Sequence, residues 1–569
     1  MKKALLVAAV TAVSAFTAMA DWGTNVSDQI AMFPTGTISY GLDVQPTPEG
    51  GAWGVIYHPN LKNAEGETDI KNVIYEYRVQ CWDKNGNALF PEEGLLVSDF
   101  NNKSYTVVNN YLSVDAEGNA ILAVMDCRNS NSQYSSYTAY KISQKGEMLW
   151  GEEGMPISDP LSPQLFSAMI TGVPMEDGSV MFSWIGSNDA EGGTNVYLQR
   201  LDKNGKTCWD EKKVALLDDE CSNPYLVYSG DNTCILVYSR TASQIIYARK
   251  IDFEGENVWG KDTRVYRGGW GSIPIHTLIS VVPSGDGGAL ISWNDDRNNT
   301  NIEDPYLFYL KPDGKIGFQS ASEEGDVKLG YANNRSFNVK AVPAADGSAF
   351  YAAWRETSSS QGLQGLRMQK LNKTGELLWD ENGLSIDPMS EKSVGYISLQ
   401  SAESDKVMLF YMRYYNYFNQ VGYASLLDSN GKFVWSDSGM TQITPDNHKS
   451  SNLLSMPVPG NESWLYYWSD APGEETETDE TTYRMGKLYI SGNIGEDKSA
   501  VFTPFMNGGN VRFDGATLYS DGKIATVYSP SGVVVKKVIF KDGEANLDLY
   551  KGLYMISIDG QKTVKVAVH

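Results

Sequence analysis

The chain has 569 residues, enough for several domains or for one repeat array followed by a small domain. It carries 70 acidic and 47 basic residues, a formal net charge of −23, so its surface repels phosphate groups and disfavours nucleic acid and anionic membranes as partners. Its five cysteines are too few and too scattered for a disulfide scaffold, and their spacing suggests no metal site.

The first twenty residues have the features of a secretory signal peptide. Two lysines precede an apolar run, and Ala18-Met19-Ala20 offers a small-x-small cleavage site before Asp21. No later segment reaches the roughly 18 apolar residues that a membrane helix needs. We therefore expect an exported monomer without a membrane span, located at the cell surface, in the extracellular medium or in the periplasm.

Residues 21–500 contain eight related units, and each is marked by a tight glycine turn. The turn glycines lie 50 to 61 residues apart: Gly86, Gly146, Gly205, Gly255, Gly314, Gly375, Gly431 and Gly492. In seven units an aromatic residue follows four positions after the glycine: Phe90, Trp150, Trp209, Trp259, Phe318, Trp379 and Trp435. Self-similarity at such a period indicates a repeat architecture.

Each unit predicts four short antiparallel strands. Tyrosine-rich alternating segments separated by Gly, Asn and Asp are typical of all-β structure, and units of this size favour a β-propeller over a solenoid. The eighth unit lacks its fourth strand, and Trp22-Gly23 resembles Trp150-Gly151, where a fourth strand starts. We therefore predict an eight-bladed propeller closed by an N-terminal strand. Seven blades are the alternative if the short fourth unit is irregular.

The amino-acid sequence of the repeats resembles a family of bacterial exported propeller repeats. That family's pattern reads apolar-Trp-x-Asp-x-Arg, then Tyr-x-Gln-Arg-Leu-Asp-x-x-Gly-x-x-x-Trp, and the segments 293–297 and 197–209 match it. The resemblance covers roughly residues 21–500 and departs most in unit five. It implies the propeller fold and says little about the ligand.

Residues 501–569 predict a separate small β-sandwich, because the repeat stops and short β segments alternate with Gly and Asp turns. The segments 528–534 and 551–554 resemble parts of the C-terminal sorting domains of the type IX secretion system in Bacteroidetes-like bacteria. This resemblance implies export across the outer membrane, followed by surface attachment or release. The usual Pro-Asn-Pro opening is absent, which leaves a periplasmic protein as the alternative.

Motifs of several common enzyme classes are missing: the sequence has no GxSxG, no HExxH and no Walker loop. We assign no catalytic residue, no metal and no cofactor. His58 and His448 map to the face that carries the loops between second and third strands, in the neighbouring units one and eight. Cys221 and Cys234 flank an expected hairpin turn, so they are either bonded across two strands or buried as free thiols.

Arginines form a stronger pattern on the same face. Five of them lie at or just past the end of a second strand: Arg128, Arg240, Arg297, Arg355 and Arg413. A ring of guanidinium groups would bind carboxylate or sulfate groups bidentately. Alternatively, each arginine pairs with a nearby acid, such as Asp126 or Asp295, and fastens its own blade. Recurrence in most units favours the second interpretation.

Ligand-binding residues are expected where the repeat breaks. The unit-seven loop at 411–420 concentrates tyrosine and amide side chains, which suit sugar stacking or a protein contact. Trp270 lies in a glycine-rich loop between units four and five. We predict a non-enzymatic binding propeller that recognises a glycan or a protein through a shared loop face. The predicted ligand-binding residues are Arg297, Arg355, Arg413, Tyr414, Tyr415, Tyr417, Trp270 and His58.

Two other functions stay open. One is a carbohydrate-active enzyme, a glycoside hydrolase or polysaccharide lyase, with acid/base work by carboxylates on the same face, such as Asp189, Asp295 and Asp296. The other is a purely structural or assembly component, which would follow if the loop face were flat and fully salt-bridged.

Overall fold

The structure is a computed structural model. It describes residues 22–60, 73–102, 109–126, 128, 136–158, 169–188, 193–210, 213–214, 221–240, 245–267, 280–297, 300, 302–319, 322–435, 439–473 and 481–495, and the strands and a few flanking residues between 512 and 568. These residues form strands and turns, and within them no helix is long and apolar enough to cross a membrane. The chain divides into two compact units, Met1–Lys487 and Leu488–His569.

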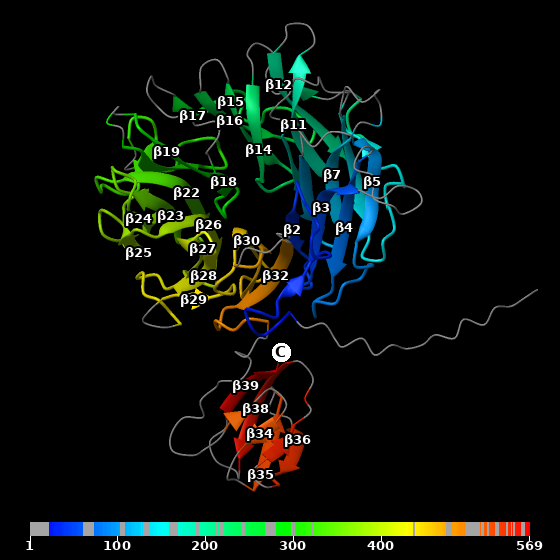
Figure 1. The fold of residues 1–569 in the computed structure, drawn as a ribbon, viewed down its shortest axis with the longest axis vertical. Helices are drawn as coiled ribbons and strands as arrows, with labels where there is room; N and C mark the ends of the chain where they lie inside the picture. The colour runs from blue at the N-terminus through cyan, green and yellow to red at the C-terminus, as the bar shows by residue number, and fades with distance from the viewer. Residues whose placement is uncertain are drawn as a thin grey trace, which may run out of the picture. The chain divides into compact units, whose positions relative to one another are not determined.

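The first unit is an eight-bladed β-propeller, as predicted (Figure 1). Blades one to four contain β2 (Asp43–Pro46), β3 (Ala52–Asn60), β4 (Ile74–Trp82) and β5 (Leu95–Asn102); β6 (Asn110–Val114), β7 (Ala120–Asp126), β8 (Ser136–Ile142) and β9 (Met155–Pro156); β10 (Ile170–Pro174), β11 (Val180–Asn188), β12 (Gly193–Leu201) and β13 (Lys213–Val214); and β14 (Cys221–Tyr228), β15 (Cys234–Arg240), β16 (Ile245–Ile251) and β17 (Thr263–Arg267). The fourth blade is a regular four-stranded sheet, so the seven-bladed alternative is wrong.

The remaining four blades follow the same order. They contain β18 (Ser280–Pro283), β19 (Ala289–Asp295), β20 (Asp304–Leu310) and β21 (Asp326–Lys328); β22 (Arg335–Pro343), β23 (Ala349–Thr357), β24 (Gln364–Asn372) and β25 (Leu384–Ser390); β26 (Ser393–Ser401), β27 (Val407–Asn416), β28 (Asn419–Leu427) and β29 (Thr441–Gln442); and β30 (Ser451–Pro457), β31 (Ser463–Asp470), β32 (Thr482–Tyr489) and β1 (Ile30–Ala31). The first strand of each blade faces the central axis, and the fourth lies outermost (Figure 1).

The N-terminal strand closes the ring, as predicted. β1 pairs antiparallel with β32 through Ile30 and Ala31, and so supplies the outer strand of blade eight. At the inner side of the ring, β30 of blade eight contacts β2 of blade one. The first and last parts of the propeller are therefore joined by hydrogen bonds as well as by packing.

Hydrophobic clusters lie between neighbouring blades. Second strands such as β7 and β19 are buried along their whole length, because a neighbouring blade covers each face of their sheet. The cluster between blades one and two includes Trp53, Tyr77 and Leu122, and the cluster between blades eight and one includes Trp22 and Phe33. Burial of these side chains holds adjacent blades together.

The repeated turn and the repeated aromatic residue form one device that joins neighbouring blades. All eight turn glycines have a positive φ, which favours glycine. The Trp150 indole N–H donates to the Lys203 carbonyl in the next blade's turn, at 3.1 Å. Trp209, Trp259 and Trp379 repeat this bond with the residue two before the following turn glycine. The signal that revealed the repeat is therefore structural.

The two candidate disulfide cysteines do not face each other. In the pairing of β14 with β15, Cys221 lies opposite Arg240, whereas Cys234 lies opposite Tyr228. Both are buried free thiols, and the Cys234 sulfur lies 3.3 Å from the Met181 sulfur. The hairpin is long enough to place one cysteine at each end of the strand pair, so the bonded alternative is wrong.

The second unit contains a small β-sandwich, as predicted. One sheet has three strands: β33 (Arg512–Phe513), β34 (Thr517–Tyr519) and β37 (Glu544–Asn546). The other has four: β36 (Val534–Ile539), β35 (Ile524–Tyr528), β38 (Gly552–Ile558) and β39 (Val564–Val568). Leu518, Val527, Leu547 and Ile556 share the core. The resemblance to secretion sorting domains stays a prediction.

Candidate functional site

Four innermost strands carry a β-bulge with one residue in the left-handed region. In three of them it is an asparagine: Asn223 in β14 at φ 52°, Asn338 in β22 at φ 55° and Asn452 in β30 at φ 57°. Asparagine tolerates this conformation better than most residues other than glycine. In β26 the residue is Tyr396, at φ 48°. A bulky side chain held there indicates local strain, and such strain gathers at functional sites.

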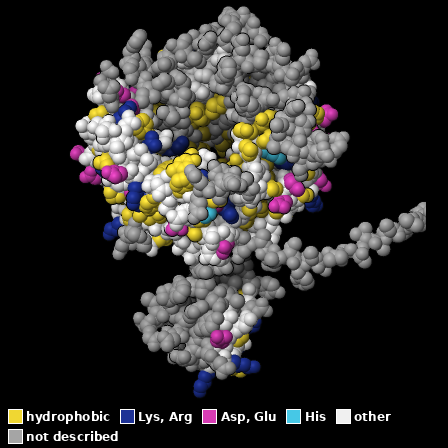
Figure 2. All heavy atoms as spheres, in the orientation of Figure 1, with side chains coloured by type: hydrophobic (Ala, Val, Ile, Leu, Met, Phe, Trp, Pro, Cys, Tyr) yellow, Lys and Arg dark blue, Asp and Glu magenta, His cyan; other side chains and the backbone are white. Residues whose placement is uncertain are grey.

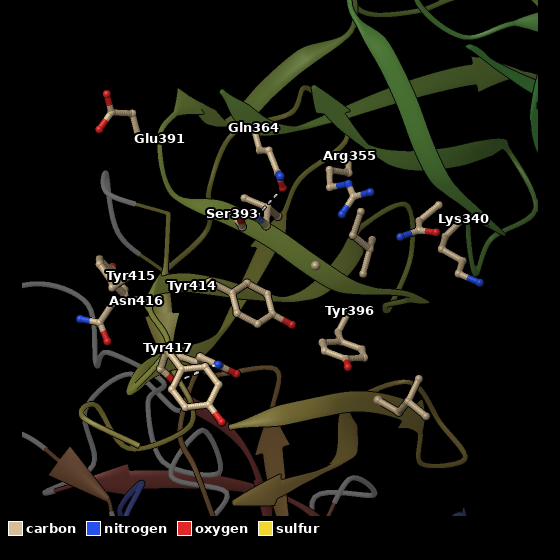
Figure 3. A pocket seen from close by; sticks show the side chains of 16 residues that line it. Lys340, Arg355, Gln364, Glu391, Ser393, Tyr396, Tyr414, Tyr415, Asn416 and Tyr417 are labelled. Atoms are coloured by element: carbon tan, nitrogen blue, oxygen red, sulfur yellow. Dashed lines mark hydrogen bonds between the residues drawn. The ribbon is translucent and has the colours of Figure 1, made fainter. Parts of the chain in front are cut away.

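A cavity of about 830 Å³ lies between blades six and seven, where Tyr396 projects. The bulges of β22 and β26 form part of its lining, and the end of β27 with the start of β28 forms another part. Figure 3 shows Arg355 and Lys340 on one side of this cavity and the rings of Tyr414, Tyr396 and Tyr417 on the other. We call this cavity the blade-six/seven pocket.

Three of the five second-strand arginines are paired with carboxylates. The Arg128 Nη2 lies 2.6 Å from Asp126, and the Arg297 Nη2 lies 2.6 Å from Asp326. Arg413 contacts Asp387 with two of its nitrogens. Arg128 and Arg297 therefore fasten their own blades, as the second interpretation of the arginine pattern expects. Arg413 differs, because Asp387 belongs to blade six and their contact joins blade seven to blade six. Arg240 stacks over the Tyr247 ring at 4.6 Å.

Arg355 differs from those three. Among the residues that the structure describes, no carboxylate pairs with it, and its Nε is buried without a hydrogen-bond partner. Arg128 and Arg297 have an aspartate two residues earlier, but blade six has Ala353 there. The adjacent Glu356 accepts a 2.7 Å hydrogen bond from Arg367 instead. Burial lowers the pKa of the Arg355 guanidinium, which stays charged at neutral pH.

Lys340 is the second cation of the pocket. It follows the β22 bulge and lies opposite Ala353 in the sheet register, while Phe337 lies opposite Arg355. Within the described part of the chain, Lys340 has no ion-pair partner, and burial lowers the pKa of its ammonium group. Two neighbouring strands of blade six thus present two positive charges to the same cavity of an acidic protein.

Tyrosine rings supply most of the aromatic surface of the pocket. The rings of Tyr396 and Tyr414 have their centroids 6.5 Å apart. Tyr417 lies at the tip of the β27–β28 turn with 67% of its surface exposed, and Lys449 sits 5.1 Å from its ring centre. The Tyr415 hydroxyl is 2.8 Å from that of Tyr423, which ties it to the blade. Amide groups of Asn416 and Gln420 complete this side.

The structure brings together four of the eight predicted ligand-binding residues: Arg355, Tyr414, Tyr415 and Tyr417. Arg297 and Arg413 bind structural carboxylates. His58 belongs to blade one, where its Nε2 lies 3.8 Å from Glu76. Trp270 lies outside the described residues, so its role in ligand binding stays a prediction.

The carboxylates suggested for an enzyme have structural partners where they are described. Asp295 accepts hydrogen bonds from Arg297 at 2.9 Å and from the Tyr266 hydroxyl at 2.7 Å. Asp296 accepts one from the Thr300 backbone N–H at 2.8 Å. Both side chains are buried. Asp189 lies outside the described residues.

Sequence reasoning missed Lys340 and Tyr396. The signal for Tyr396 was present, because the first strands of three other units hold an asparagine at the corresponding place and this unit does not. No comparable signal marked Lys340, since the direction of its side chain depends on the bulge at Asn338.

Figure 2 shows the hollow at the centre of the ring, with hydrophobic and Lys or Arg side chains on the side of blades five to seven.

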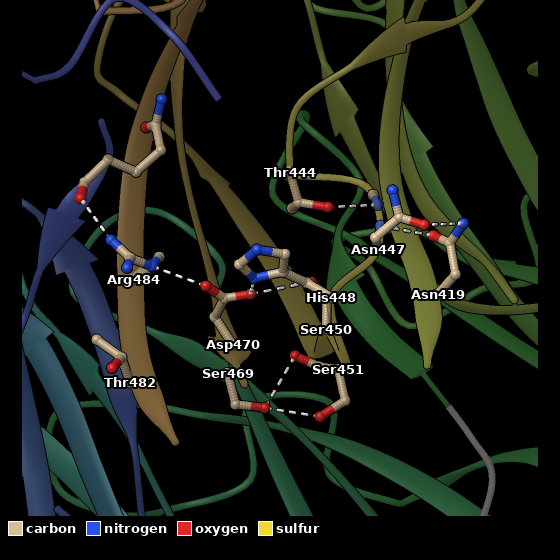
Figure 4. Close-up of polar contacts among 12 residues, drawn as sticks. Asn419, Thr444, Asn447, His448, Ser450, Ser451, Ser469, Asp470, Thr482 and Arg484 are labelled. Atoms are coloured by element: carbon tan, nitrogen blue, oxygen red, sulfur yellow. Dashed lines mark hydrogen bonds and ion pairs between the residues drawn. The ribbon is translucent and has the colours of Figure 1, made fainter. Parts of the chain in front are cut away.

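A second polar cluster lies in blade eight, beside the closing strand (Figure 4). Asp470 accepts a hydrogen bond from Arg484 at 2.8 Å and lies 3.0 Å from the His448 Nδ1. Arg484 also donates to the Gln29 carbonyl at 3.2 Å, which links the cluster to the N-terminal segment. Its contacts join strands of the ring seam, so we assign it a structural role.

Comparison with known proteins leaves the family open. No protein-family model and no curated protein matches the chain. Among solved structures, the α-L-arabinofuranosidase of Lactobacillus brevis is 11% identical over 50% of this chain and 95% of that one, with a TM-score of 0.29. The Dos1 propeller is 9% identical over 79% and 95%, with a TM-score of 0.39. Likenesses at this level carry no argument about function.

A third match is to prolyl oligopeptidase B from Galerina marginata. It is 12% identical over 77% of this chain and 57% of that one, with a TM-score of 0.40. The matched proteins thus include enzymes as well as a propeller without a named activity. The all-β propeller fold stands on the strands and their pairing in this chain.

Proposed function

We propose that this protein is a binding propeller that holds a glycan in the blade-six/seven pocket without transforming it. The observation that carries the proposal is Tyr396, a bulky residue in a strained conformation that places its ring in the pocket beside Tyr414. Strain of this kind persists where the surrounding structure compensates for it, and it is frequent at binding sites.

The dimensions and chemistry of the pocket suit a short saccharide. Its volume of about 830 Å³ is within the usual range of ligand pockets. Tyrosine rings bury large apolar area with few rotatable bonds, which favours stacking on the apolar face of a sugar ring. The amide groups of Asn416 and Gln420 can exchange hydrogen bonds with sugar hydroxyls.

Export belongs to the same proposal. The N-terminal segment and the C-terminal resemblance support a location in the envelope or outside the cell, where glycans are plentiful. The carbohydrate-active enzyme stays the alternative. The structural partners of Asp295 and Asp296 support binding over hydrolysis by those two carboxylates.

A glycan array with the full chain tests this proposal, followed by calorimetry on the best ligand. We expect Tyr417→Ala to weaken binding about tenfold, which is ~1.4 kcal/mol, because a stacking ring is lost. The matched control is Tyr331→Ala, since Tyr331 is also exposed, at 58%, and lies 5.0 Å from Lys328. That variant should bind like the wild type.

Three outcomes would contradict the proposal. The first is an array that yields no glycan ligand, and the second is a Tyr417→Ala variant that binds as tightly as Tyr331→Ala and the wild type. Cleavage of the bound glycan during incubation, seen as new reducing ends or unsaturated products, would favour the enzyme alternative instead.

A further inference from the structure

We infer that the blade-six/seven pocket selects a saccharide that carries an anionic group, a carboxylate or a sulfate ester, and binds this group through Arg355 and Lys340. This inference rests on the proposed function and names the chemical class of its ligand. Unlike the arginines of blades two, five and seven, Arg355 and Lys340 have no carboxylate partner among the described residues.

The charge of Arg355 is left for a ligand. In blades two, five and seven a carboxylate neutralises the corresponding arginine. In blade six, Ala353 replaces the aspartate that precedes Arg128 and Arg297 by two residues, and Glu356 binds Arg367. Phe337 stacks with Arg355 at 5.1 Å, which fixes the guanidinium without neutralising it. A planar guanidinium held in this way binds carboxylate and sulfate bidentately.

Lys340 adds a second positive charge on the neighbouring strand. The β22 bulge lies between the positions of Phe337 and Lys340, and it brings the lysine into the lining of the same cavity as Arg355. Burial disfavours the charged form of both groups. An anion between them would offset that penalty, because attraction is stronger where water is partly excluded.

Other charges around the pocket agree with this assignment. Lys392 lies 4.4 Å from the centre of the Tyr415 ring, and Lys449 lies beside Tyr417, so two more cations flank the tyrosine side. Glu391 is the carboxylate in the lining of the described pocket, and it is exposed. Figure 3 draws the Glu391 carboxylate far from both Arg355 and Lys340. A sugar ring on the tyrosines would therefore turn its acid group toward blade six.

Paired probes test the inference with the full chain. Oligogalacturonate is compared with its neutral methyl ester, and a sulfated galactan oligosaccharide with its desulfated form. We expect the anionic member of at least one pair to bind at least tenfold more tightly than its neutral partner. The pair that shows this preference distinguishes a carboxylate from a sulfate site.

Two variants assign the preference to the two cations. Arg355→Gln and Lys340→Gln should each reduce affinity for the anionic probe about tenfold or more, and affinity for the neutral probe by a clearly smaller factor. Lys315→Gln removes the same charge from the exposed surface, where Lys315 pairs with Asp313, and should change neither affinity. Circular dichroism melts establish that each variant is folded. If one of the two pocket variants does not fold, the other still tests the inference.

The results separate this inference from the proposed function. Equal binding of anionic and neutral probes by the wild type would overturn the inference and leave glycan binding intact. If no saccharide binds, but inorganic sulfate raises the melting temperature of the wild type and not of Arg355→Gln, the anion site stands and glycan binding fails. Unchanged affinity of both pocket variants, or no response to any probe, would overturn the inference.

Discussion

Tyr396 combines a strained backbone with a place in the pocket where we propose that a glycan binds. It occupies a left-handed position at φ 48°, where three other blades have asparagine. We expect Tyr396→Asn to raise the free energy of unfolding of the propeller by about 1–2 kcal/mol, because the strain of a bulky residue is removed. Urea denaturation followed by tryptophan fluorescence measures the change. The same variant should bind the glycan ligand more weakly.

The reverse exchange serves as the control for this prediction. Asn223 has the same conformation in blade four, away from the pocket, and its amide donates to the Ser239 hydroxyl at 3.2 Å. Asn223→Tyr should destabilise the protein and leave ligand affinity unchanged. A Tyr396→Asn protein that is less stable than the wild type would show that the tyrosine contributes more by packing than it loses by strain.

At the scale of single residues, the sequence predicted part of the pocket. The repeat is interrupted at Tyr414, Tyr415 and Tyr417, and such an interruption can be recognised from the local amino-acid sequence alone. Lys340 was not found, because a bulge turns its side chain toward the cavity and one extra residue in a strand leaves no mark in composition. Arg355 belongs to the predicted ring of arginines, but its lack of a carboxylate partner among the described residues depends on the bond between Glu356 and Arg367, which the sequence does not reveal.

At the scale of elements, the polar cluster of blade eight makes the seam sensitive to pH. The hydrogen bond with Asp470 raises the pKa of His448 above its usual value. For Asp470 itself, burial raises the pKa, but hydrogen bonds and charges from His448 and Arg484 lower it on balance. A raised histidine pKa stabilises the fold below the unfolded pKa, and this contribution is lost as pH rises through the folded value.

We expect the stability difference between the wild type and His448→Gln to be larger at pH 5.5 than at pH 8. The extra stabilisation is at most about 1 kcal/mol, because His448 is partly exposed and solvent screens the pair. Denaturant unfolding at the two pH values measures it. The carboxylate contributes with the opposite sign, since its lowered pKa stabilises the fold at higher pH and this is lost in acid. An equal difference at both pH values would contradict the prediction.

The elements themselves were the best predicted part of the molecule. Each turn needs a glycine with positive φ, and each second strand is buried on both faces, so both leave strong marks in the sequence. The register of the strands was harder to predict. The hairpin with Cys221 and Cys234 was foreseen, but its pairing places the two cysteines at opposite ends. Register depends on which side chains fill the space between blades, and composition does not record that.

At the scale of the whole molecule, closure depends on a short N-terminal segment. The Trp22 indole N–H donates to the Lys84 carbonyl at 2.7 Å, two residues before Gly86. Four tryptophans make the same bond with the next blade: Trp150, Trp209, Trp259 and Trp379. Trp22 therefore acts as the aromatic residue that blade eight lacks. The similarity of Trp22-Gly23 to Trp150-Gly151 was therefore a reliable guide to the closing strand.

Removal of residues 21–33 should consequently destabilise the entire ring. The deletion exposes the cluster in which Trp22, Met32 and Phe33 are buried, and each such side chain contributes roughly 1.5–3 kcal/mol. It also leaves the outer edge of β32 unpaired over the register that Ile30 and Ala31 occupy. We expect a marked fall in melting temperature, measured by circular dichroism, and partial recovery when a peptide of residues 22–36 is added. The peptide would restore the backbone hydrogen bond from the Met32 N–H to the Tyr483 carbonyl as well as the buried side chains. An unchanged melt after the deletion would mean that packing of the innermost strands β30 and β2 is sufficient to close the propeller.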